Sequence, residues 1–212
     1  VTYNVYGDPR GMDRPWQLDA FPLVVSAAEW RGLRAALEQR ATLLDLLLAD
    51  VHGPQRLLHE GLLPPELVFA HPGFLRPCHG IALPEDRHLH VYAADIARSP
   101  DGQWWVLADR TQAPSGAGYA LENRIVLSRA LPEAFREGRI ARLAGFFRTL
   151  RDTLRRLAPG GRENPRIALL TPGPYNETYF EHAYLARYLG YTLVEGADLT
   201  VRERSLYLKT LG

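Results

Sequence analysis

Residues 166–194, RIALLTPGPYNETYFEHAYLARYLGYTLV, decide the fold class of this chain. The apolar run 166–171 predicts a buried strand, residues 175–189 have helical spacing of their apolar side chains, and Gly190 is a typical helix stop. A second apolar run, 191–194, predicts another strand. Two strands joined by a helix make a β-α-β unit, so we expect the start of an α/β lobe here.

A hairpin is the clearest expectation upstream of this unit. The runs 88–97 and 103–109 are rich in apolar, β-branched and aromatic residues. They are joined by Ser99-Pro-Asp-Gly102, whose Asp-Gly pair supplies the positive φ that a tight turn requires. The sequence therefore predicts two antiparallel strands between residues 88 and 109.

Three long helices are expected from the spacing of apolar residues. Ser26 and Glu29 form a capping-box pattern, and a helix over 27–50 should follow it. Apolar residues at helical spacing also predict helices over 119–129 and 140–157. Shorter elements are expected as follows: a strand at 3–6, a turn at 7–11, helical pieces at 54–60 and 65–68, a loop over 71–84 and a hairpin over 198–210.

The elements together predict an α+β fold, with a hairpin-based sheet and helices ahead of the β-α-β lobe. The densest cluster of proline and glycine, at 159–165, lies between two strongly periodic segments and predicts a boundary. We therefore expect two domains, 1–160 and 161–212. The second should be truncated, because both ends of the chain read as cuts in a longer protein.

Composition excludes several classes of protein. The chain has 212 residues, of which 46% are hydrophobic and 23% charged, so it should be globular rather than disordered. A net charge of +1 favours neither nucleic acid nor a membrane surface as a partner. No apolar run approaches the roughly 20 residues of a membrane span. Its single cysteine, Cys78, forms no internal disulfide, which fits a cytoplasmic protein.

Sulfur and imidazole chemistry has weak support in the sequence. His88 and His90 on one strand, with Cys78 and His79 upstream, would suggest a transition-metal site, yet a second cysteine is missing. The evidence for Cys78 as a nucleophile activated by His79 is equally weak, because adjacent residues of an extended chain point to opposite faces. An ordinary thiol is the better interpretation. Arginines along 139–156 are best explained as a solvated helix face.

Two places favour binding of charged groups. The segment 171–176 joins a strand to a helix, so its backbone amides and the helix N-terminus would suit an anion. Asp95 and Asp109, on the two expected hairpin strands, would share a magnesium ion if they faced the same side.

Several of these motifs resemble one family. The segments Tyr3-Asn-Val-Tyr-Gly-Asp8, Pro114-Ser-Gly116 with Leu121-Glu-Asn-Arg124, Leu170-Thr-Pro-Gly-Pro-Tyr-Asn176, Tyr179-Phe-Glu-His-Ala183 and Val194-Glu-Gly196 look like those of bacterial circularly permuted ATP-grasp proteins, relatives of glutathionylspermidine synthetase. The resemblance covers residues 3–209 and implies part of an ATP-grasp fold. It also implies an ATP-dependent carboxylate–amine ligase that uses magnesium in the full-length protein.

The resemblance also implies an altered metal site. In the family pattern an Asp, a Glu and an Asn hold magnesium, and they match Asp95, Ala108 and Arg110 here. Two open interpretations follow: a ligase with a changed metal arrangement, or a degraded domain that serves as a binding or interaction module. Expected partners are a small carboxylate and an amine, or the rest of the same chain, and this fragment alone should hold neither ATP nor magnesium.

The resemblance assigns no catalytic residue. It assigns metal binding to Asp95. Asp109 stays a candidate metal ligand by residue type, although strand alternation turns it toward the opposite face unless a bulge intervenes. Nucleotide or substrate binding is assigned to Asp8, Arg110, Ser115, Gly116, Arg124, Gly173, Tyr175, Asn176 and Glu181.

Overall fold

The structure is a computed structural model that describes residues 2–4, 13–19 and 21–210. The expected turn at 7–11 and the candidate Asp8 lie outside the described residues. Residues 23–114 form one compact unit, and the described residues before and after them form a second. These units divide the chain at positions other than residue 160, and the expected domains 1–160, ATP-grasp-like, and 161–212, the start of a pre-ATP-grasp-like lobe, stay a prediction.

The unit 23–114 is built on one long helix, α1 (Ala27–His52). Its start is the expected capping box: the Ser26 hydroxyl accepts from the Glu29 amide at 3.2 Å, and the Glu29 carboxylate accepts from the Ser26 amide at 3.1 Å. Short helices α2 (Arg56–His59) and α3 (Pro65–Phe69) follow. The expected loop over 71–84 contains a 3₁₀ turn, η1 (Arg76–Cys78), and a second, η2 (Pro84–Asp86), begins at its end.

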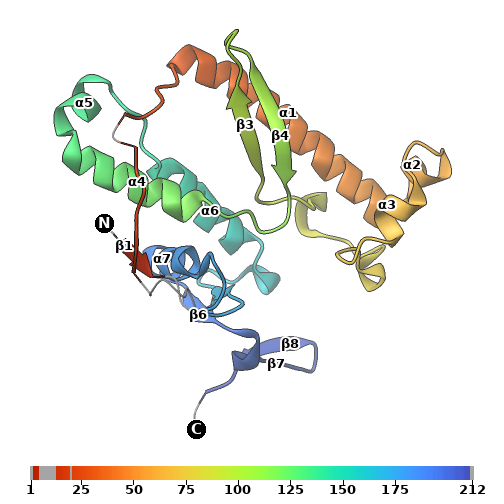
Figure 1. Cartoon of the computed structure of the whole chain (residues 1–212). Helices are drawn as coiled ribbons and strands as arrows, with labels where there is room; N and C mark the ends of the chain where they lie inside the picture. The colour runs from red at the N-terminus through yellow and green to blue at the C-terminus, as the bar shows by residue number, and fades with distance from the viewer. Residues whose placement is uncertain (1, 5–12, 20, 211–212) are drawn as a thin grey trace. The chain divides into compact units, whose positions relative to one another are not determined.

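The expected hairpin is present and lies beside α1 (Figure 1). Strands β3 (Ala93–Arg98) and β4 (Trp104–Arg110) are antiparallel, and Gly102 in the turn has φ +85°. The prediction that pairing begins at residue 88 is wrong. The amides of His88 and Leu89 instead donate to the Asp45 carboxylate of α1 at 2.8 and 2.7 Å, which ties this segment to the helix ahead of the strand.

The second unit contains the remaining helices (Figure 1). A short antiparallel pair, β1 (Thr2–Asn4) and β2 (Asp13–Pro15), precedes the first unit in sequence. After residue 114 come α4 (Ala117–Ala130), α5 (Pro132–Glu137), α6 (Ala144–Arg156) and a 3₁₀ turn, η3 (Pro159–Gly161). Helix α6 starts later than the predicted residue 140: a turn at Gly138 and Arg139, with Arg139 at φ +47°, follows α5, and residues 140–143 are not helical.

The β-α-β unit is confirmed. Strands β5 (Ala168–Leu170) and β6 (Thr192–Val194) pair in parallel, and α7 (Tyr179–Leu189) connects them. The helix begins at residue 179 rather than 175, because the Asn176 side chain accepts from the Thr178 amide and hydroxyl and holds a turn ahead of it. The predicted last hairpin is also present, with a 3₁₀ turn ahead of it: η4 (Gly196–Asp198), β7 (Leu199–Arg202) and β8 (Ser205–Leu208).

Aromatic side chains join the helices of the second unit. Trp16 contacts Tyr119 of α4 and Phe180 of α7, each with ring centroids 5.5 Å apart. Phe147 of α6 is buried and meets Tyr188 of α7 at 5.1 Å. These contacts place α4, α6 and α7 around a shared core.

Candidate functional site

The hairpin carries the first cluster of predicted site residues, an ion pair between Asp95 and Arg110. The Arg110 Nε donates to both carboxylate oxygens of Asp95 at 3.1 Å, and an Nη donates to Oδ2 at 2.7 Å. Asp95 lies opposite Ala108, and Arg110 is two residues farther along β4, so all three share one face of the hairpin. The hydrogen bond from Arg110 lowers the pKa of Asp95, and Asp95 raises the pKa of Arg110.

Asp109 faces the other side of the hairpin, toward α1. The Arg40 guanidinium donates to its two carboxylate oxygens at 2.6 Å each, and the Tyr92 hydroxyl donates to Oδ1 at 2.7 Å. The hydrogen bonds from Arg40 and Tyr92 lower the pKa of Asp109. Burial, followed by the bond to Asp109, raises the pKa of Tyr92 to about 12.

This arrangement does not fit a magnesium ion shared by Asp95 and Asp109. The register shift in the hairpin follows Asp95 on β3 and leaves Leu107 unpaired on β4, so it does not bring the two carboxylates to one face. Both carboxylates are already engaged by arginines. Among the described residues, no three His, Cys, Asp or Glu side chains form a group able to hold a metal ion. The two aspartates therefore lie on opposite faces, as strand alternation predicts, and the condition for a shared ion is not met.

The second unit brings Gly116 and Glu181 together. Glu181, in the first turn of α7, is 2% exposed, and its carboxylate accepts from the amide of Gly116 at 2.8 and 2.9 Å and from that of Gly118 at 2.7 Å. The N-terminus of α4 is thereby capped by a side chain from another helix. We call Gly116, Gly118 and Glu181 the glutamate cap. Ser115, just ahead of it, is exposed.

The segment 171–176 is held by its own hydrogen bonds. Gly173, with φ +105°, donates its amide to the buried Thr171 hydroxyl at 3.2 Å. The Asn176 side-chain oxygen accepts a hydrogen bond from the Thr178 hydroxyl, whereas Tyr175 is 83% exposed. His182 lies between Thr171 and Thr178, with ring nitrogens 2.9 and 3.1 Å from their hydroxyls. Burial lowers the pKa of His182. Binding of an anion by this segment stays a prediction.

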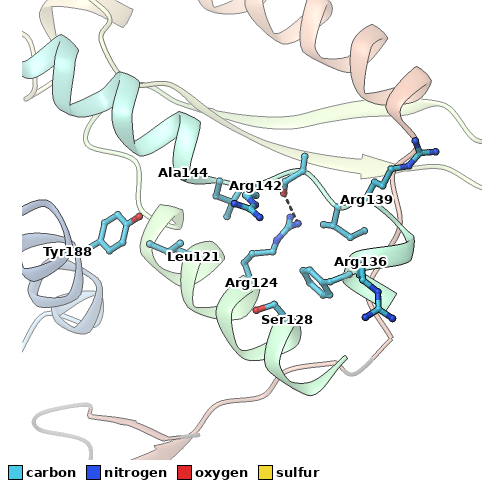
Figure 2. Close-up of a pocket in the computed structure, with 12 residues that line it drawn as sticks. Leu121, Arg124, Ser128, Arg136, Arg139, Arg142, Ala144 and Tyr188 are labelled. Carbon is cyan, nitrogen blue, oxygen red and sulfur yellow. Dashed lines mark hydrogen bonds between the residues drawn. The ribbon is translucent and has the colours of Figure 1, made fainter. Parts of the chain in front are cut away.

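Arg124 lines a hollow of about 730 Å³ that the sequence did not indicate (Figure 2). Its Nη1 donates to the Ala141 carbonyl at 3.0 Å, and its guanidinium lies 5.7 Å from the centre of the Phe135 ring. Arg139 and Arg142, expected on a solvated helix face, belong to the connection between α5 and α6 and line this hollow with Arg136. The signal that could have found it is the spacing of arginines at 136, 139 and 142 around Gly138, where a helix stops.

None of the helices in the described part of the chain is long and apolar enough to cross a membrane.

Comparison with known proteins identifies the family. Residues 22–212 match the family model of circularly permuted ATP-grasp type 2 proteins. An uncharacterized protein of Mycobacterium tuberculosis is 48% identical over 198 residues, which are 93% of this chain and 22% of that protein. An uncharacterized Synechocystis protein is 39% identical, with 99% of this chain and 44% of the relative covered. A second uncharacterized M. tuberculosis protein is 38% identical over 94% of this chain and 36% of the relative. The chain thus spans less than half of each of these three relatives, and it belongs to the circularly permuted ATP-grasp type 2 family.

Proposed function

We propose that this chain is part of an ATP-dependent ligase that joins a carboxylate to an amine. The observation that carries the proposal is the family match over residues 22–212. In such a reaction the carboxylate attacks the γ-phosphorus of ATP to give an acyl phosphate and ADP. The amine then attacks the acyl carbon and releases inorganic phosphate, so the energy of one ATP bond is transferred to the new amide bond.

Arg110 is the residue that we assign to the phosphates in this proposal. Asp95 holds the guanidinium by three hydrogen bonds, so its position and charge are fixed before a substrate arrives. A guanidinium matches the geometry of phosphate oxygens and carries a permanent positive charge. Because the described residues do not fit a magnesium ion here, we route no step through that ion.

The test is ATP turnover by the full-length protein, measured with and without magnesium. Arg110→Ala should lower kcat at least about tenfold, because a positive group near the transferred phosphate is lost. Arg34→Ala is the matched control, since it removes an arginine from another exposed ion pair, with Glu38, in the same unit. Equal turnover in wild type, Arg110→Ala and the control would refute the assignment of Arg110.

A second candidate function is a degraded domain that serves as a binding or interaction module. The observation that favours it is the Asp95–Arg110 pair, in which the groups at the candidate metal site satisfy each other. Ala108→Glu combined with Arg110→Asn should create magnesium-dependent turnover if only the metal ligands are missing. Wild-type protein that neither binds nor hydrolyses ATP would support the module.

For the 212-residue chain alone, we expect ATP binding weaker than micromolar, measured by calorimetry.

A further inference from the structure

The hollow around Arg124 is assembled from five parts of the second unit. Helix α4 supplies one wall, and α5 and the connection to α6 supply the others. Ala144 comes from α6 and Tyr188 from α7 (Figure 2). Its volume of about 730 Å³ falls in the range of roughly 300–1,000 Å³ typical of small-molecule sites. The hollow is therefore large enough for an organic ligand rather than a single ion.

The charge of this hollow has one sign. Four arginines line it, no acidic residue does, and in the described part of the chain none of the four forms an ion pair; they are Arg124, Arg136, Arg139 and Arg142. Arg124 lies in the middle of the lining residues, and Arg136 and Arg139 lie at the rim and extend away from it (Figure 2). Neighbouring guanidinium groups without acidic partners are donors suited to phosphate and carboxylate groups.

Apart from Ser128 and the Tyr188 hydroxyl, the rest of the lining is apolar. Leu121 is buried, and Phe135, Ile140, Leu143 and Tyr188 complete the walls. The Arg124 guanidinium already lies over the Phe135 ring, so this side of the site is rigid before a ligand enters. Walls of this kind would contact an apolar or aromatic body, while the arginines take its charged groups.

We propose that this hollow binds a small organic ligand that has two or more anionic groups, carboxylate or phosphate, on an apolar or aromatic body. Arg124, one of the two arginines that the sequence resemblance suggested, becomes one member of a four-arginine site. The binding does not require ATP turnover, so it stands or falls independently of the proposed ligase activity.

The experiment is isothermal titration calorimetry on the full-length protein at about 50 mM salt, where charge attraction is weakly screened. Benzene-1,3,5-tricarboxylate should bind with a Kd tighter than about 1 mM. Tricarballylate has the same number of carboxylates without the ring and should bind at least about threefold more weakly, because the apolar contacts are lost. Pyrophosphate tests the phosphate source: binding tighter than that of tricarballylate indicates a phosphate ligand, and weaker binding a carboxylate ligand.

Arginine variants locate the binding. Arg136→Ala and Arg142→Ala should each weaken binding of the tricarboxylate about tenfold, and the double variant more than either alone. Arg148→Ala, which removes an exposed arginine of α6 outside the hollow, is the control and should change the Kd less than twofold. Ala144→Trp should block binding by filling the space without removing charge. Wild-type protein that binds none of the probes, or arginine variants that bind like the control, would overturn the proposal.

Discussion

The glutamate cap makes a sharp prediction about stability. Glu181→Ala removes the acceptor of two amides at the start of α4, leaving the donors of Gly116 and Gly118 without their partner. Hydrogen bonds to a charged group contribute about 1.5–3 kcal/mol each, and a buried donor left unpaired is costly. We expect the free energy of unfolding to fall by about 3–5 kcal/mol, a large share of the roughly 5–15 kcal/mol of a typical domain.

Gly118 gives the matching half of a double-mutant cycle. A Cβ at this position would lie 2.8 Å from Cγ of Glu181, so Gly118→Ala should overpack the contact and cost about 1–3 kcal/mol. When Glu181 is already alanine, that Cγ is gone and the added methyl group favours the helix. The second substitution should then cost less than about 1 kcal/mol, because only the contact with Leu185, at 3.3 Å, remains.

Urea unfolding of the four proteins, followed by circular dichroism, measures the cycle. Hydrogen exchange of the Gly116 and Gly118 amides gives a local readout, and it should accelerate in Glu181→Ala. Glu177→Ala, an exposed glutamate ahead of the same helix, is the control and should stay within about 0.5 kcal/mol of wild type. Effects of Glu181→Ala and Gly118→Ala that add within about 0.5 kcal/mol would refute the reasoning, because the two sites would then not be in contact.

Three further predictions concern single side chains. Tyr92→Phe removes a hydrogen-bond donor to Asp109, so the free energy of unfolding in urea should fall by about 0.5–1.5 kcal/mol. The pKa of Asp109, measured by NMR titration, should rise, and an unchanged pKa would contradict the observed hydrogen bond. Burial lowers the pKa of His182 in the folded state, so the unfolded chain takes up the proton at a higher pH than the folded chain does. The contribution of His182 to the free energy of unfolding should therefore be fully present above pH 6.5 and decrease as the pH falls below it. A His182→Gln variant should show a smaller decrease. Ser26→Ala should cost about 1 kcal/mol, measured by thermal unfolding, because the Glu29 amide loses its cap; no loss would show that the helix start is stabilised elsewhere.

The α+β class and most local elements could be read from the sequence. The capping box at Ser26, the turn at Gly102 and the stop at Gly190 depend on contacts between residues close in the chain, and all three are present. Errors fell at element ends, where a distant or neighbouring side chain competes for backbone groups. Asp45 takes the amides of His88 and Leu89 ahead of the hairpin in this way.

The site depended on contacts that sequence spacing does not report. Its residue type singled out Asp95, and the family resemblance singled out Gly116 and Glu181. Nothing in their spacing indicated that Glu181 caps α4 across 65 residues, or that Arg40 binds Asp109 across 69. The hollow lined by four arginines likewise required α4, α5 and α7 to pack together. Periodicity and turn chemistry are set by neighbours along the chain, so the sequence alone determined the elements and the family resemblance. Which charges meet is decided by how faces of distant elements pack, and only the tertiary structure contained that information.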